Sequence, residues 1–325
     1  MATTDPTLVA TTGTEILPIA GEVQARSPWE IFWRRFRQDR AAMAGLVVIG
    51  VLIVLALAAP LFANYVNHHP PNITYPNTQL NQYGVPRGPS GQFWFGVDPN
   101  ARDLFVRILY GARVSLIIAF AATGISLALG VAAGIVAGFY RGWVDTVLAR
   151  LMDIMLAFPL LLLAIGLGQA CAVKGCFGGV IRPGLGLVTM IIAFANWPYL
   201  ARIIRGQVLS IREKEYIEAA RSLGASNARI LAAEVLPNLA APIIVYASLV
   251  IPINILFEAA LSFLGVGINP PDASWGQMIG DAASSGAFTY AWWFMVFPGV
   301  FLLATVLAFN LVGDALRDAL DPRGR

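Results

Sequence analysis

Histidine and lysine are scarce in this chain, and their scarcity excludes whole classes of function. The two histidines, His68 and His69, are adjacent, so a Ser–His–Asp triad is not supported and a metal site lacks its further donors. The two lysines, Lys174 and Lys214, do not follow a glycine, as the lysine of a phosphate-binding loop does. We therefore expect no metal, no cofactor and no enzymatic activity, and no ATP hydrolysis by this chain alone.

Charged residues are also scarce, which places the chain among membrane proteins. They make up 13% of the 325 residues, whereas soluble domains carry roughly 25%. Several apolar runs reach the length of about 20 residues that a spanning helix needs, and they lack the alternation of a membrane barrel. The sequence predicts an all-α membrane protein with six transmembrane helices, at about 41–63, 112–139, 148–170, 185–204, 239–264 and 291–312.

The distribution of arginine and lysine predicts the orientation of these spans. If the N-terminus is cytosolic, 16 of these residues lie in inside segments and 6 in outside segments. This is the positive-inside bias of membrane proteins. We expect a multi-pass protein of the cytoplasmic membrane with both termini cytosolic, in contact with lipid and with no nucleic-acid partner.

The segments around the spans have distinct compositions. The first residues are Thr-rich and lack the basic start and apolar core of a signal peptide. Asp98 and Pro99 are typical of an N-cap and a first helical position, so they predict an amphipathic helix that meets the second span at Gly111. The predicted segments are a disordered cytosolic tail (1–28), an interfacial amphipathic helix (29–40), the first span with a long outer loop and amphipathic helix (41–110), a core with spans two to six (111–313) and a cytosolic tail (314–325).

A polar segment at about 212–237 separates the fourth and fifth spans. Four residues in it recur at i, i+3, i+4 and i+7 and share one helix face: Tyr216, Ala219, Ala220 and Leu223. Gly224 is expected to end this helix, Ser226 to cap a second one, and Pro237 to interrupt that second helix. Two short helices joined at a glycine, on the cytosolic side, predict a docking element for another protein.

Glycine spacing and membrane-embedded acids give further candidates. Gly130, Gly134 and Gly138 are four residues apart in the second span, which predicts close helix packing rather than contact with a substrate. Ionisable residues within spans are functional candidates by default, so Asp153 and Glu258 are candidates for a gate or pathway. Arg150, three residues before Asp153, favours a structural ion pair there.

Cys171 and Cys176 follow the third span in a loop that is predicted to face outward. An outer location permits a disulfide, although closing so short a loop stabilises a protein least. A disulfide, two unpaired thiols and a redox switch therefore stay open as interpretations.

The polar segment carries a spacing that resembles a known family. Glu218-Ala219-Ala220 is followed by Gly224 and by Leu236-Pro237. This order and spacing resemble the EAA loop of binding-protein-dependent ABC importer permeases. The chain departs from that pattern at Glu234, where the family has isoleucine, a position that affects how the second helix sits.

Other segments are similar to the dipeptide and oligopeptide subgroup of that family, and the resemblance covers about residues 29–323. Ala101 departs from it, because the subgroup has glycine before the Arg-Asp pair. The similar segments are Phe95–Asp98, Arg102-Asp103, Arg107, Tyr110-Gly111, Arg113–Leu116, Leu261–Gly265, Pro270-Pro271, Ser274–Gly276 and Gly313–Pro322.

The resemblance implies a permease subunit that moves dipeptides or oligopeptides across the cytoplasmic membrane. It implies a second permease chain as heterodimer partner, two cytosolic ABC ATPase subunits that bind ATP and Mg, and an extracytoplasmic solute-binding protein. The residues expected to couple to the ATPase are Tyr216, Glu218, Ala219, Ala220, Leu223, Gly224 and Pro237. Other cargoes of the family, namely glutathione, nickel and haem, stay open. From other classes of protein, so do an ion-coupled secondary transporter that uses Glu258 and a purely structural subunit.

Overall fold

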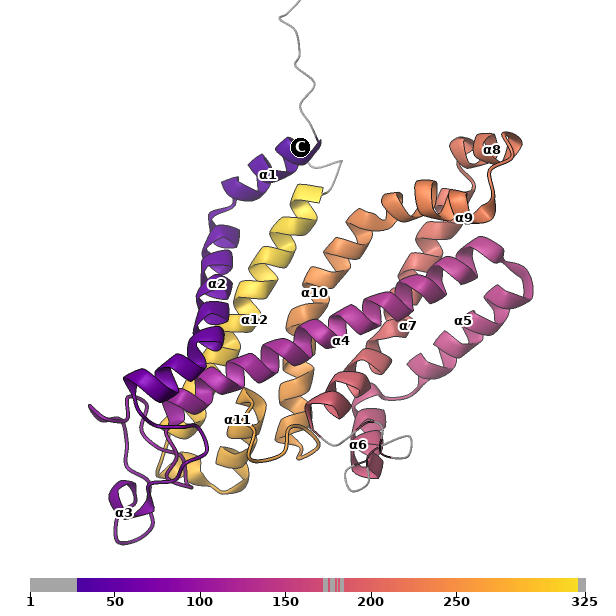
Figure 1. The fold of residues 1–325 in the computed structure, drawn as a ribbon. Helices are drawn as coiled ribbons and strands as arrows, with labels where there is room; N and C mark the ends of the chain where they lie inside the picture. Colours follow the sequence, from indigo (N-terminus) through magenta and orange to yellow (C-terminus); the bar gives the residue numbers. More distant parts are fainter. Residues whose placement is uncertain (1–27, 172–174, 176–178, 180, 182–183, 321–325) are drawn as a thin grey trace, which may run out of the picture.

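The computed structural model describes residues 28–171, 175, 179, 181 and 184–320, and in this part of the chain the predicted all-helical membrane fold is confirmed (Figure 1). The short π-helical turns η1 (Phe62–Val66) and η3 (Leu231–Val235) and the 3-10 turn η4 (Ala287–Thr289) adjoin longer helices. The α-helices are α1 (Pro28–Gln38), α2 (Arg40–Leu61), α3 (Pro76–Gln79), α4 (Leu104–Tyr140), α5 (Gly142–Ala157), α6 (Leu160–Cys171), α7 (Leu185–Arg212), α8 (Glu215–Ser222), α9 (Asn227–Ile230), α10 (Leu236–Phe263), α11 (Trp275–Ser284) and α12 (Trp293–Leu320).

Within the described residues, five helical stretches are long and apolar enough to cross a membrane. Each overlaps one of the predicted spans. They are Arg40–Val66, Leu104–Tyr140, Leu185–Arg212, Asn227–Phe263 and Trp293–Leu320.

The third predicted span, at 148–170, is formed by two helices rather than by one. α5 and α6 together are long and apolar enough to cross a membrane, but they are bent by 86° at their junction. The cause is Pro159, which has no N–H to donate and excludes helical conformation from the residue before it. Phe158 accordingly has an extended backbone, with φ −79° and ψ 135°. The third predicted span is therefore present as a bent pair.

α4 is one continuous helix, so the predicted separate amphipathic helix that starts at Asp98 is wrong. The N-cap is Asp103, whose Oδ1 accepts a hydrogen bond from the Val106 N–H at 3.2 Å. Asp98 lies in the preceding turn, where its Oδ1 accepts from the Arg102 N–H at 2.9 Å. Gly111 lies inside the helix because α11 packs against it: a Cβ there would lie 2.9 Å from Met278 Cε.

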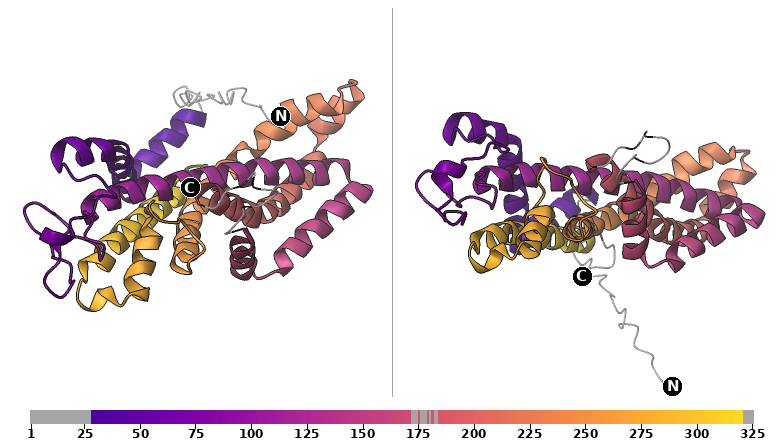
Figure 2. Two further views of the ribbon diagram at one scale, coloured as in Figure 1. Left: turned by 60° about the horizontal axis from the view of Figure 1, so that its bottom comes forward. Right: turned by 90° about the horizontal axis from the view of Figure 1, so that it is seen from below.

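The long helix α4 crosses the molecule diagonally and lies against α7 along much of its length (Figure 1). Figure 2 shows that the helices form a flattened slab, with α2 at one edge and α5 at the opposite edge. α3 and α11 lie near one end of the helices, and α1 and α8 lie at the other. We call these the α11 end and the α8 end.

α1, α2 and α12 pack together as one group. Phe32 and Phe36 of α1 are buried against Ala315 and Ala319 of α12. α2 approaches α12 so closely that a Cβ on Gly45 would lie 2.8 Å from the Ala308 carbonyl oxygen. α12 continues to Leu320, so the predicted tail at 314–325 begins within a helix. Residues 1–27 and 321–325 lie outside the described residues.

At the α11 end, the loop between α2 and α4 is folded onto the last span. The Trp293 indole N–H donates to the Val97 carbonyl oxygen at 3.0 Å. The guanidinium of Arg107 is buried and donates to the Pro71 carbonyl oxygen at 3.2 Å, and its Nε lies 3.4 Å from an Asp98 oxygen. Buried donors and charges that find partners in this way fix the loop in one conformation.

Candidate functional site

The polar segment between the spans folds as two short helices at the α8 end. α7 ends at Arg212, and α8 begins after a two-residue turn. Gly224, with φ +81°, reverses the chain after α8, which a glycine does without the steric cost that a Cβ imposes. The Ser226 hydroxyl oxygen then accepts a hydrogen bond from the Arg229 N–H at 3.4 Å and caps α9.

Two isoleucines that the sequence reasoning missed fix this segment to the spans. Ile217 of α8 and Ile230 of α9 are completely buried. Both belong to an apolar cluster that includes Phe139 of α4, Val208 of α7 and Leu239 of α10. The detectable signal was a large aliphatic residue in each polar helix, Ile217 after Tyr216 and Ile230 before Leu231. Burial of such a side chain contributes about 1.5–3 kcal/mol, so the two short helices are held in place despite their length.

The predicted face of α8 is split between solvent and core. Tyr216 is 42% exposed and Leu223 is 88% exposed, and Ala219 is exposed between them. Ala220 instead turns partly inward and packs against the apolar cluster around Ile217. The exposed surface of Tyr216, Ala219 and Leu223 is therefore available to another protein, and we call it the α8 surface.

Glu218 lies exposed beside the α8 surface. In the described part of the chain it makes no ion pair with Lys214, four residues before it, or with Arg221, three residues after it. The guanidinium of Arg221 lies over the Phe139 ring, 5.7 Å from its centroid. The carboxylate of Glu218 is therefore accessible to a basic side chain of another protein.

Pro237 does not interrupt the second helix, so this expectation is wrong. The chain runs from α9 through the π-helical turn η3 into α10 as one helical stretch from Asn227 to Phe263. Pro237 lies in the first turn of α10, where a missing N–H costs least. A π-helical turn directly before it takes up the altered hydrogen bonding.

The three glycines of α4 lie directly against α7. A Cβ on Gly130 would lie 2.8 Å from the Leu200 Cβ, one on Gly134 would lie 2.7 Å from the Ala201 carbonyl oxygen, and one on Gly138 would lie 2.8 Å from the Val208 Cβ. Real Cβ atoms essentially never approach other atoms this closely. A larger residue at any of the three positions would force the two helices apart.

The two acidic candidates occupy different environments. Glu258 of α10 is completely buried, and its two carboxylate oxygens accept hydrogen bonds from the hydroxyls of Ser115 at 3.0 Å and Ser262 at 2.7 Å. Asp153 of α5 is exposed and pairs with Arg202 of α7 at 2.7 Å and, as predicted, with Arg150 at 3.8 Å. Both acids join neighbouring elements, so neither position requires a role in a pathway.

Cys171 and the two histidines belong to other segments than the α8 surface. Cys171 is buried at the end of α6, and Cys176 lies outside the described residues, so the disulfide stays a prediction. His69 Nδ1 lies 2.8 Å from an Asp103 oxygen, and its ring stacks on Phe93 at 4.2 Å between centroids. Among the described residues no group of three or more His, Cys, Asp or Glu side chains is placed to hold a metal.

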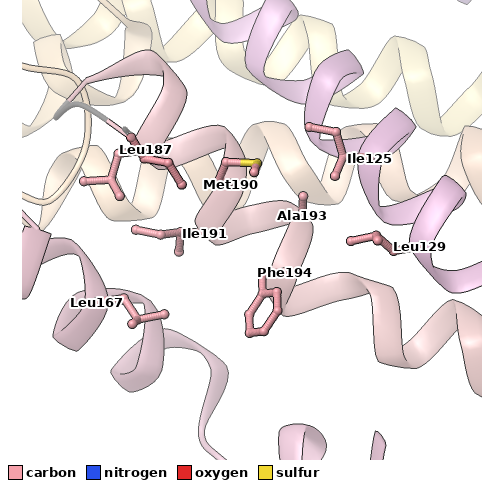
Figure 3. Close-up of a pocket in the computed structure, with 9 residues that line it drawn as sticks. Ile125, Leu129, Leu167, Leu187, Met190, Ile191, Ala193 and Phe194 are labelled. Carbon is pink, nitrogen blue, oxygen red and sulfur yellow. The ribbon is translucent and has the colours of Figure 1, made fainter. Parts of the chain in front are cut away.

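An apolar cavity of about 260 Å³ lies between α4, α6 and α7 (Figure 3). The described residues that line it are all apolar and include Leu129, Leu167, Met190 and Phe194. The side chains of these described residues offer no polar group that could orient a ligand.

Comparison with known proteins gives consistent matches. The family described as the inner membrane component of binding-protein-dependent transport systems matches residues 130–325. The N-terminal TM domain of oligopeptide transport permease C matches residues 27–82.

Curated relatives match over nearly the full chain. The dipeptide transport system permease protein DppC of Alkalihalophilus pseudofirmus is 39% identical over 94% of this chain and 93% of that protein. The oligopeptide transport system permease protein OppC of Bacillus subtilis is 40% identical over 92% of this chain and 91% of that protein. The glutathione transport system permease protein GsiD of Pectobacterium atrosepticum is 38% identical over 94% and 95%, respectively.

A solved structure shares the fold. The inward-facing MetNI methionine ABC transporter aligns with a TM-score of 0.54 and covers 67% of this chain and 96% of its own chain. Its sequence identity is 19%, so this likeness shows the fold alone.

Proposed function

This chain belongs to the family of inner membrane components of binding-protein-dependent transport systems, and from that membership we propose how it works. It is a multi-pass permease subunit of an ABC importer in the inner membrane. We infer that its cargo is a dipeptide or a longer peptide. The names of the relatives support this, since dipeptides, oligopeptides and glutathione are all short peptides.

We propose that the transport energy comes from partner chains. The absence of a Gly-Lys pair in the sequence supports this, because a phosphate-binding loop requires one. The partners are two cytosolic ATPase subunits that bind ATP and Mg, a second permease chain that completes a heterodimer, and an extracytoplasmic solute-binding protein. In this arrangement both termini and the α8 end face the cytosol, in agreement with the positive-inside bias.

The observation that carries the proposal is the α8 surface. Large apolar side chains on a short exposed helix are unfavourable unless a partner covers them. Tyr216 and Leu223 are exposed, while Ile217 on the same helix is buried and holds it in place. A fixed helix that presents an aromatic, an aliphatic and a small residue can insert into a groove of the ATPase. Motion of that groove then moves α8.

The test is the coupling of ATP hydrolysis to substrate in the reconstituted complex. Ala219→Glu places a long charged side chain in the α8 surface, and Gly224→Val places a β-branched residue at φ +81°. We expect each variant to insert normally and to weaken the contact between the α8 surface and the ATPase by about 1.4 kcal/mol. Because that free energy is a factor of about ten in an equilibrium constant, substrate-stimulated ATPase activity should fall by about ten-fold. The matched controls are Ala219→Ser, which keeps the size small, and Gly206→Val, at a helical glycine with open space around it.

Unchanged stimulation in both Ala219→Glu and Gly224→Val would count against the α8 surface as the ATPase contact. The ion-coupled alternative gains no support from Glu258, because both of its oxygens already accept hydroxyl hydrogen bonds. The ligand of the solute-binding protein that co-purifies with the complex decides the cargo within the peptide class.

A further inference from the structure

Helix α5 is attached to the rest of the chain by charged groups and by a small apolar contact, in which Met152 packs against Trp197 and Ala201 of α7. Of its 16 residues, all of them described, Met152 alone is buried. The carboxylate of Asp145 accepts two hydrogen bonds from the guanidinium of Arg205 on α7, at 2.5 and 2.8 Å. Asp153 pairs with Arg202, also on α7, at 2.7 Å. α5 is therefore held at two points along one face of α7, and the bidentate pair is the stronger kind.

The turn that precedes α5 is joined to the turn that precedes α8. The guanidinium of Arg141 forms an ion pair with Glu213. Arg212, the last residue of α7, donates a hydrogen bond to the carbonyl oxygen of Phe139. The ring of Phe139 lies under the guanidinium of Arg221 of α8 and in the same apolar cluster as Ile217. A continuous set of contacts thus runs from α8 to the start of α5.

The backbone of this turn has an unusual conformation. Arg141 has φ +57°, a value that non-glycine residues seldom adopt, and Gly142 follows with φ +65°. Such a conformation persists only where the surrounding structure holds it. The contacts of Arg141 and Phe139 supply that restraint, so the turn has a defined geometry.

The other end of α5 meets α6 at a sharp bend. The bend at Phe158 and Pro159 separates α5 from α6. α6 is fixed elsewhere: Gly168 lies so close to Val266, after α10, that a Cβ would lie 1.8 Å from a methyl group of that valine. α5 is therefore tied to the second half of α7 and to α8, whereas α6 packs on the first half of α7, around Leu187 and Ile191, and on the segment after α10. The residues between two such units absorb the difference when they move.

We propose that Arg141, Asp145 and Asp153 are positioning residues of the transport cycle, which make α5 move together with α8. A displacement of α8 then reaches the bent pair α5–α6 and changes its angle. This proposal rests on the proposed function, because it takes α8 as the helix that the ATPase moves. None of the three residues belongs to the EAA-like pattern.

The first test measures distances between spin labels in the complex with its ATPases. Labels go on the exposed residues Thr146 of α5, Ser222 of α8 and Leu303 of α12, in a chain with Cys171 and Cys176 replaced by serine. We expect the 222–303 distance to shift between the nucleotide-free and ATP-trapped complexes, while the 146–222 distance keeps one distribution. A 146–222 shift as large as the 222–303 shift would overturn the proposal. No shift at 222–303 would overturn the premise about α8 instead, and the proposal with it.

The second test is a charge exchange at the bidentate pair. Asp145→Arg and Arg205→Asp each place two like charges together, and the double variant restores an ion pair with its polarity reversed. We expect each single variant to lose at least about five-fold in substrate-stimulated ATPase activity, at the low end of coupling factors between sites, with basal ATPase activity and assembly retained. The double variant should recover most of it. The matched control is Arg150→Lys on the same helix, where the side chain is 77% exposed and the positive charge beside Asp153 is kept.

Two outcomes of the exchange contradict the proposal. One is that the single variants assemble and retain full stimulation. The other is that the double variant restores stimulation while the 146–222 distance still shifts with ATP, because coupling would then not depend on α5 moving with α8. If a single variant fails to assemble, the label distances measured in the chain that keeps Asp145 and Arg205 decide the question.

Discussion

The contact between α4 and α7 gives the sharpest prediction on stability, because α4 carries its own control. A Cβ on Gly134 would lie 2.7 Å from both the Ala201 carbonyl oxygen and the Ile204 Cβ, whereas one on Gly124 would have nothing within 4 Å. Both glycines lie inside the same helix. Replacing each with alanine therefore makes the same chemical change in a crowded and in an open place.

The size of the effect follows from these distances. Carbon atoms in contact prefer a separation of about 3.5–4.0 Å, so at Gly134 the two helices would have to separate by several tenths of an ångström or more. Overpacking of this kind costs about 1–3 kcal/mol. Alanine also favours a helix over glycine by up to about 1 kcal/mol, and this gain is common to both variants. Gly134→Ala should therefore be less stable than Gly124→Ala by about 1–3 kcal/mol.

The assay is unfolding of the purified protein in detergent, followed by the loss of helical circular dichroism as temperature or SDS rises. We expect the midpoint of Gly134→Ala to lie below that of the unmodified protein, and that of Gly124→Ala to lie at or above it. Equal midpoints for the two variants would show that α4 and α7 do not approach as closely as the structure places them, and would refute the reasoning.

Three further substitutions test separate parts of the structure. Ile217→Ala should cost about 2–5 kcal/mol of local stability and expose α8 to limited proteolysis, without loss of membrane insertion; unchanged cleavage would contradict its anchoring role. Glu258→Gln should leave ATP-driven uptake intact, since an amide still accepts a hydroxyl hydrogen bond, and abolished uptake would restore the ion-coupled alternative. Arg107→Met should lower the free energy of unfolding, and with it the unfolding midpoint, because it leaves a buried charge with fewer partners. The loss should lie toward the lower end of about 3–5 kcal/mol, since Arg102 still pairs with Asp98; an unchanged midpoint would contradict this.

The spans could be predicted from the sequence because hydropathy and length are local properties. What the sequence did not yield is where helices break or continue. Pro159 breaks a helix, yet Pro198, Pro252 and Pro298 lie inside α7, α10 and α12. The difference depends on whether neighbouring helices hold the chain straight, which is a tertiary property. The start of α4 is similar: Asp103 caps it while also bound to His69, 34 residues away.

The candidate site was found by periodicity, but periodicity does not tell which face of a helix meets its own protein and which meets a partner. Tyr216 and Leu223 are exposed as a docking face requires, whereas Ala220 turns inward because the burial of Ile217 sets the rotation of α8. The ion pairs that join α5 to α7 carried no sequence signal. The partners of Asp145 and Asp153 lie 60 and 49 residues further along the chain.

The close pairing of α2 with α12 has a consequence for how the protein is made. The first span packs along the last one, with Gly45 against the Ala308 backbone, and the two phenylalanines of α1 rest on the end of α12. During synthesis α1 and α2 are therefore made before α12, and they lack their contacts with it until the ribosome has translated nearly the whole chain. The last helix to be inserted is the one that closes the assembly. A nascent chain arrested before Trp293 should thus leave α1 accessible to protease, and release of the remaining residues should protect it.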